Sequence, residues 1–147
     1  MPLCFAYGSN LSLDQMRRRC PDSRPLQAGC LEGYRLDFGH YSSGWNGGTA
    51  DVVADPNHEV WGLIYDLSEE DLQELDNYEG YPEIYTRFQT DIQTRDRRIV
   101  DVWVYAVVDK KEFVHPATAY LEIIKKAAIE YNFPEKYRSY LEAIEVV

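Results

Sequence analysis

The sequence has little cysteine, few basic residues and no long apolar run. Its three cysteines are odd in number and match neither a C-x-x-C motif nor a zinc-binding spacing. This pattern argues against a disulfide framework, so we expect free thiols in a reducing, cytoplasmic compartment. No apolar run approaches the ~18 residues that a membrane-spanning helix needs. No basic segment followed by an apolar core marks a secretory signal.

The small number of Lys and Arg residues also limits the kinds of molecule that the protein can bind. The chain has 15 Lys and Arg against 25 Asp and Glu, which gives a formal net charge of -10. Nucleic acid and anionic membranes repel such a surface, so we expect neither as a partner. The three histidines show no metal-ligand spacing, so we expect no metal site. They are His40, His58 and His115.

A chain of 147 residues is long enough to bury a core of its own, and we expect one domain over residues 1–147. Hydrophobic periodicity and capping residues predict the secondary structure. The expected strands are 27–38 with a bulge at Gly33, 49–54, 59–67, 85–93 and 98–108. The expected helices are 13–19, one that Ser68 caps and that ends near Tyr78-Glu79, 116–132 and one from Pro134 onward. Residues 39–48 read as a loop, and Asp55-Pro56-Asn57 as a turn.

The order of these elements lacks the regular strand–helix alternation of a doubly wound parallel sheet. A mixed α+β fold with a mostly antiparallel sheet fits better. We expect the sheet to curl into a small β-barrel with helices packed outside it.

The N-terminal stretch Phe5-Ala6-Tyr7-Gly8-Ser9-Asn10 reads as a buried strand followed by a glycine loop. Ser12 can then cap a helix, with Gln15 completing a capping box. Backbone N–H groups at such a corner point the same way and suit a carboxylate. An ordinary strand–turn–helix corner without a ligand fits the same residues.

A second candidate is Glu79, at the end of the amphipathic helix that begins after Ser68. Tyr78, Tyr81 and Tyr85 lie close to it in the sequence. If Glu79 points into an aromatic pocket, desolvation raises its pKa from ~4.3 towards ~6–7, which suits a general base. A solvated glutamate in the last helical turn is the alternative.

Nucleophilic catalysis has weaker support. Ser9 does not lie in a G-x-S-x-G elbow. Cys4 could act as a nucleophile only with a histidine close in space, and a strand cysteine is more often a small buried apolar group.

Taken together, these segments resemble the γ-glutamylcyclotransferase family. The matching pieces, in order, are Phe5–Leu11, Leu36–Gly39, Trp45–Ala50, Glu59–Gly62, Leu75-Asp76 with Glu79-Gly80, Tyr85, Tyr120 and Leu141–Glu145. They span nearly the whole chain, and their order is more specific than any one of them.

The resemblance implies a small β-barrel with flanking helices and a pocket at one end. It implies the conversion of a γ-glutamyl amino acid or amine into 5-oxoproline, without metal or cofactor. It makes Glu79 the catalytic acid–base residue. The substrate-binding residues that follow are Phe5, Ala6, Tyr7, Gly8, Ser9, Asn10, Tyr85 and Tyr120.

Two rival functions stay open at this point. One is a non-catalytic relative that binds γ-glutamyl compounds as small anions, and the other is a hydrolase that uses Cys4. The leaving group is also open, because γ-glutamyl amino acids, γ-glutamyl amines and a tailored biosynthetic intermediate share one glutamyl head. The partner we expect is such a small molecule, and either a monomer or a homodimer is compatible with the sequence.

Overall fold

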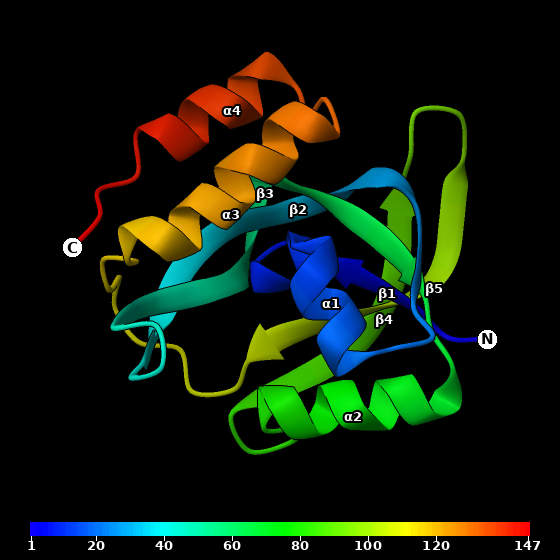
Figure 1. Cartoon of the computed structure of the whole chain (residues 1–147). Coiled ribbons are helices and arrows are strands. Elements are labelled where there is room, and N and C mark those ends of the chain that lie inside the picture. Colours follow the sequence, from blue (N-terminus) through cyan, green and yellow to red (C-terminus); the bar gives the residue numbers. More distant parts are fainter.

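A computed structural model describes residues 1–147 and shows a closed five-stranded β-barrel with helices outside it (Figure 1). The strands are β1 (Leu3–Ala6), β2 (Arg24–Ser42), β3 (Gly47–Asp66), β4 (Tyr85–Gln93) and β5 (Arg98–Val107). The helices are the short 3-10 helix η1 (Ser9–Leu11), α1 (Leu13–Arg19), α2 (Glu69–Glu79), α3 (Thr118–Glu130) and α4 (Glu135–Glu142). The predicted α+β barrel is therefore confirmed.

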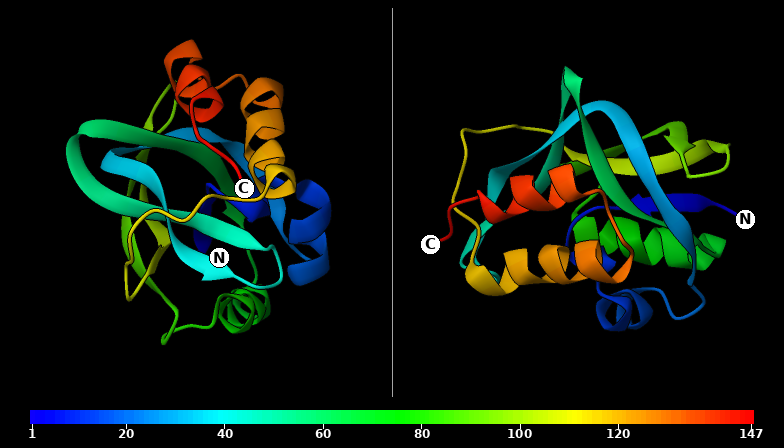
Figure 2. Two further views of the ribbon diagram at one scale, coloured as in Figure 1. Left: turned by 90° about the vertical axis from the view of Figure 1, so that its left-hand side faces the viewer. Right: turned by 90° about the horizontal axis from the view of Figure 1, so that it is seen from above.

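The strand order around the barrel is β1-β3-β2-β4-β5. All neighbouring strands pair antiparallel except β1 and β5, which run parallel and close the barrel. In the views of Figures 1 and 2, α3 and α4 lie together on one side of the barrel and α2 lies on the opposite side. Because β1 pairs with β3 and β5, the turn that follows it lies between the ends of these two strands.

The strands β2 and β3 form a hairpin that is longer than we predicted. Residues 39–42 and 47–48, expected in a loop, belong to these strands. The two short strands 49–54 and 59–67 are one strand, so the predicted chain-reversing turn at 55–57 is wrong. Glu32 of β2 pairs with Glu59 of β3, and Tyr34 pairs with Ala54. The residues of β3 between Ala54 and Glu59 outnumber those of β2 between Glu32 and Tyr34, so they form a bulge and β3 continues beyond it.

Local signals account for several of these boundaries. Gly33 adopts φ +81° at the bulge, as predicted, a conformation that other residues rarely take. Ser68 and Asp71 form a complete capping box at the start of α2. Ser12 accepts a hydrogen bond from the Gln15 N–H, but the Gln15 side chain bonds to Arg19 instead of returning to the cap.

The barrel and the helices share one apolar core of 34 buried residues, contributed by all five strands and all four α-helices. Phe5, Ile64 and Val104 fill the barrel, and Tyr120, Leu121 and Ile124 bury the inner face of α3. None of the helices has the length and apolarity that crossing a membrane requires.

Candidate active site

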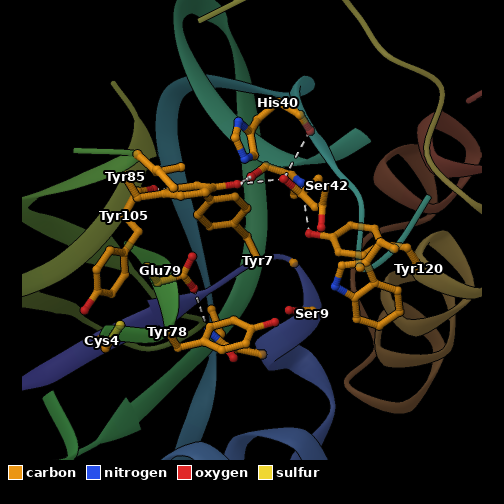
Figure 3. A pocket seen from close by; sticks show the side chains of 18 of the residues that line it. Cys4, Tyr7, Ser9, His40, Ser42, Tyr78, Glu79, Tyr85, Tyr105 and Tyr120 are labelled. Atoms are coloured by element: carbon orange, nitrogen blue, oxygen red, sulfur yellow. Dashed lines mark hydrogen bonds between the residues drawn. The ribbon is translucent and has the colours of Figure 1, made fainter. Parts of the chain in front are cut away.

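A pocket of about 480 Å³ opens at one end of the barrel (Figure 3). Its volume lies within the range of small-molecule sites. All nine residues that we predicted for the site line it: Phe5, Ala6, Tyr7, Gly8, Ser9, Asn10, Glu79, Tyr85 and Tyr120. The fold thus brings together residues that lie up to 115 positions apart in the chain, from Phe5 to Tyr120.

Glu79 owes its direction to helix α2. Leu75 is fully buried against the core, and Glu79 lies four residues later, on the same face of the helix. Gly80 then ends α2 in a left-handed conformation with φ 74°. The Tyr81 N–H returns to the Asp76 carbonyl at 2.9 Å, as in a Schellman-type helix end. The helix therefore stops where its last side chain enters the pocket.

The carboxyl of Glu79 faces the N-terminal turn. Asn10 Nδ2 donates to Glu79 Oε1 at 3.4 Å. Glu79 is partly exposed, and because it lines the pocket, we attribute this exposure to the cavity. Burial raises the pKa of Glu79 from 4.5 to about 7, while the charge of Arg19 and the Asn10 hydrogen bond act in the opposite direction. A carboxyl with this pKa can both accept and return a proton near neutral pH.

Asp76 holds the end of α2 against the barrel. Its two carboxylate oxygens accept hydrogen bonds from Arg87 Nε at 2.8 Å and Arg87 Nη2 at 3.0 Å. The Tyr105 hydroxyl adds a third hydrogen bond at 2.6 Å. Since Arg87 lies on β4 and Tyr105 on β5, this cluster fixes Glu79 relative to two strands of the barrel.

Three tyrosines build the opposite wall of the pocket. The Tyr7 hydroxyl donates to the Tyr105 carbonyl at 2.6 Å. The Tyr85 hydroxyl donates to the Ala50 carbonyl at 2.9 Å, and the Tyr120 hydroxyl accepts from the Ala50 N–H at 2.9 Å. Figure 3 shows Glu79 between this wall and Tyr78.

The turn from Tyr7 to Asn10 approaches this wall closely. A Cβ on Gly8 would lie 2.7 Å from the Tyr120 hydroxyl oxygen, so any larger residue would displace Tyr120. The hydrogen bonds of the turn run from the Leu11 N–H to the Gly8 carbonyl and from the Ser12 N–H to the Ser9 carbonyl. Neither the Tyr7 N–H nor the Gly8 N–H donates a bond among the turn and loop contacts. Within these contacts both N–H groups are therefore without an acceptor.

Cys4 also lines the pocket, but its environment opposes nucleophilic chemistry. The side chain is 2% exposed, and burial, with Glu79 adding to it, raises the pKa of the thiol well above its ordinary range. A thiol in this state carries almost no reactive thiolate at neutral pH. No three His, Cys, Asp or Glu side chains are grouped so as to hold a metal ion.

Sequence reasoning missed several other residues of the pocket. Tyr105 enters it because the parallel pairing of β1 with β5 brings β5 beside the N-terminal turn. His40 and Ser42 line it from a segment that we had predicted to be a loop. Trp45 could have been found from the sequence, because aromatic residues in such a segment often form pocket walls. Its ring packs edge-on against Tyr120, with 5.0 Å between the ring centroids.

The geometry thus combines a small closed barrel with a desolvated glutamate that faces a tyrosine–glycine turn. Comparisons with known proteins agree with it. The AIG2-like family matches residues 59–141. The γ-glutamylcyclotransferases of Mus musculus and Homo sapiens are 30% and 31% identical to this chain over 148 residues, covering 97% of it and 78% of each relative. A solved γ-glutamyl cyclotransferase structure, 30% identical, superposes with a TM-score of 0.92 over 99% of this chain and 89% of its own.

This chain therefore belongs to the γ-glutamylcyclotransferase family.

Proposed function

We propose that the chain is a γ-glutamylcyclotransferase in which Glu79 is the general acid–base group and the Tyr7–Asn10 turn binds the glutamyl unit. The reaction converts a γ-glutamyl amino acid or amine into 5-oxoproline and the free amino acid or amine. One observation carries the residue roles: the Glu79 carboxyl, with a pKa of about 7, lies within hydrogen-bond reach of the Asn10 side chain. A base and a set of main-chain donors thus face a single cavity.

The reaction is an intramolecular aminolysis. The α-amine nitrogen of the substrate attacks its own γ-carbonyl carbon and forms the lactam C–N bond. The amide C–N bond to the leaving amine then breaks, and its electron pair stays on the leaving nitrogen. Glu79 removes a proton from the attacking nitrogen and delivers one to the leaving nitrogen, so the enzyme ends in its starting protonation state.

The backbone N–H groups of Tyr7 and Gly8 support the second role. They donate no bond among the turn and loop contacts, so they can bind the α-carboxylate or the γ-carbonyl oxygen. If they bind the carbonyl oxygen, they stabilise the negative charge that develops there in the transition state.

Substrate positioning supplies much of the remaining rate. Nucleophile and electrophile belong to one molecule, so the pocket has to fold the glutamyl chain and exclude water. Orientation of this kind is worth effective molarities of roughly 10⁵–10⁸ M. No enzyme nucleophile is needed, which fits the buried, protonated state of Cys4.

The product identifies the activity. Incubation with γ-glutamyl-alanine should release alanine and 5-oxoproline in equal amounts, measured by mass spectrometry. Release of alanine with free glutamate would instead support a hydrolase. Binding of the dipeptide without any release of alanine would support a binding protein. The same assay over a panel of γ-glutamyl amino acids and amines identifies the preferred leaving group.

The wider assignment follows from the same features. We propose a single domain over residues 1–147, since one core of 34 residues draws on every strand and α-helix. We also propose a reducing compartment such as the cytoplasm, because Cys4, Cys20 and Cys30 are all unpaired. The formal charge of -10 favours a small-molecule substrate over nucleic acid or an anionic membrane.

A further inference from the structure

Helix α1 ends in three consecutive arginines that have different environments. Arg17 and Arg18 are exposed, whereas Arg19 is only partly exposed. The side chain of Arg19 contacts Ser9 and Asn10 of the Tyr7–Asn10 turn, and it is not among the residues that line the pocket. The triplet therefore contains one arginine with contacts beside the site and two solvated neighbours.

Arg19 makes hydrogen bonds to three segments around Glu79. Its Nη1 donates to Ser9 Oγ at 3.1 Å and to Asn10 Oδ1. Its Nη2 donates to Gln15 Oε1 at 2.6 Å and to the Tyr78 hydroxyl at 2.6 Å. The guanidinium also lies over the Tyr78 ring, 3.7 Å from the centroid. One cation thus joins the N-terminal turn, helix α1 and the end of α2.

These contacts determine which way the Asn10 amide faces. Arginine has donors and no acceptor, so the amide oxygen must face Arg19. The Nδ2 group then points to the opposite side, where it donates to Glu79 Oε1 at 3.4 Å. Without Arg19, the amide could rotate by half a turn and place its oxygen against the Glu79 carboxylate.

The other titratable groups around Glu79 leave Arg19 as the main source of positive charge. The nearby groups on β1, in the turn after it and on β4, β5 and α3 are uncharged at neutral pH, since burial raises the pKa of each of them: Cys4, Tyr7, Tyr85, Tyr105 and Tyr120. On α2 itself, Asp76 forms an ion pair with Arg87, and the Tyr78 hydroxyl accepts a hydrogen bond from Arg19. On β2, His40 packs against Tyr85 at 5.8 Å between ring centroids.

We propose that Arg19 is a positioning residue for the acid–base group: it fixes the Asn10 amide toward Glu79 and favours the ionised form of that carboxyl, without contacting substrate. This inference rests on the proposed role of Glu79. It adds to that role the reason why Glu79 can act as a base: without the charge of Arg19, a carboxyl in an apolar pocket would stay protonated at neutral pH.

The test compares pH profiles of kcat/KM for 5-oxoproline release from γ-glutamyl-alanine. The variants are Arg19→Met, which removes the charge and the donors, Arg19→Lys, which keeps the charge, and Arg18→Met, an exposed control on the same helix. The profile falls on its acid side as Glu79 becomes protonated. Arg19→Met should raise the pH at the midpoint of this fall by about one unit, which is the size of effect expected when a nearby opposite charge is lost.

Arg19→Lys should keep the midpoint within ~0.3 unit of wild type while kcat falls about tenfold, since a single ammonium cannot hold Ser9, Asn10 and Tyr78 together. Arg18→Met should match wild type in both quantities. A wild-type midpoint in Arg19→Met, with the rate lowered equally at every pH or not lowered, would overturn the inference. If Arg19→Met fails to fold, Arg19→Lys decides, because an unchanged kcat in that variant also overturns it.

One further variant separates this inference from the assignment of Glu79. If Glu79→Gln loses turnover while Arg19→Met keeps the wild-type pH profile, only the role of Arg19 is wrong. If Glu79→Gln keeps wild-type turnover, the acid–base role of Glu79 itself is wrong, and the pH profile reports another group.

Discussion

Replacing Glu79 by Gln should stabilise the folded protein at alkaline pH and not at acid pH. Gln has the shape of a protonated Glu and never ionises. The native carboxyl, by contrast, must lose its proton inside a partly desolvated pocket as the pH rises. Since burial raises the pKa of Glu79 from 4.5 to about 7, the folded state holds the proton over a pH range in which the unfolded chain has released it.

The sign and size of this pH-dependent change in stability follow from proton linkage. Between pH 4.5 and about 7 the folded state binds more protons than the unfolded state, so the stability of the native protein falls as the pH rises. The full difference in pKa corresponds to ~3 kcal/mol at 1.36 kcal/mol per unit. About 2 kcal/mol of this should appear between pH 5 and pH 8, after allowance for the side chain's contact with pocket water.

Urea unfolding of wild type and Glu79→Gln at pH 5 and pH 8 measures this directly. The free energy of unfolding of Glu79→Gln minus that of wild type should be about 2 kcal/mol larger at pH 8 than at pH 5, so that the variant is the more stable protein at alkaline pH. Glu74→Gln is the matched control, because Glu74 is an exposed glutamate on the same helix; its difference from wild type should not change with pH. An equal difference at both pH values for Glu79→Gln would refute the desolvation argument.

Two further predictions concern the walls of the pocket. Tyr120→Phe keeps the ring but removes the hydroxyl that accepts a buried hydrogen bond from the Ala50 N–H, and should lower the free energy of unfolding by about 1–3 kcal/mol; unchanged urea unfolding would contradict it. Iodoacetamide at pH 8 should leave Cys4 unmodified and the native enzyme fully active, because the thiol is 2% exposed and protonated. Alkylation of Cys4 that tracks loss of activity would favour the cysteine-dependent alternative.

Local sequence signals identified the two segments at the centre of the site as candidates, and the family resemblance favoured them over a ligand-free corner and a solvated glutamate. The spacing of Leu75 and Glu79, with Gly80 as the helix end, places the carboxyl on the buried face of α2. Gly8 and the residues around it predicted a turn beside a buried strand. Both signals act within one element, so neighbouring residues alone determine them.

The remaining features depend on contacts between distant segments, which a single sequence does not encode locally. The Asp55-Pro56-Asn57 segment has the composition of a turn, but pairing with β2 on both sides keeps β3 continuous. Tyr105 joins the pocket only because β1 and β5 pair in parallel. The three arginines of α1 look equivalent in the sequence, and only the position of the turn distinguishes Arg19.

The central claim is that Glu79 moves the protons of lactam formation. The direct measurement is 5-oxoproline release from γ-glutamyl-alanine by Glu79→Gln, with dipeptide binding measured by calorimetry on the same preparation. The variant should bind the dipeptide and lose turnover by ~10²–10⁴-fold or more. Wild-type release of 5-oxoproline by this variant would show that another group carries the protons.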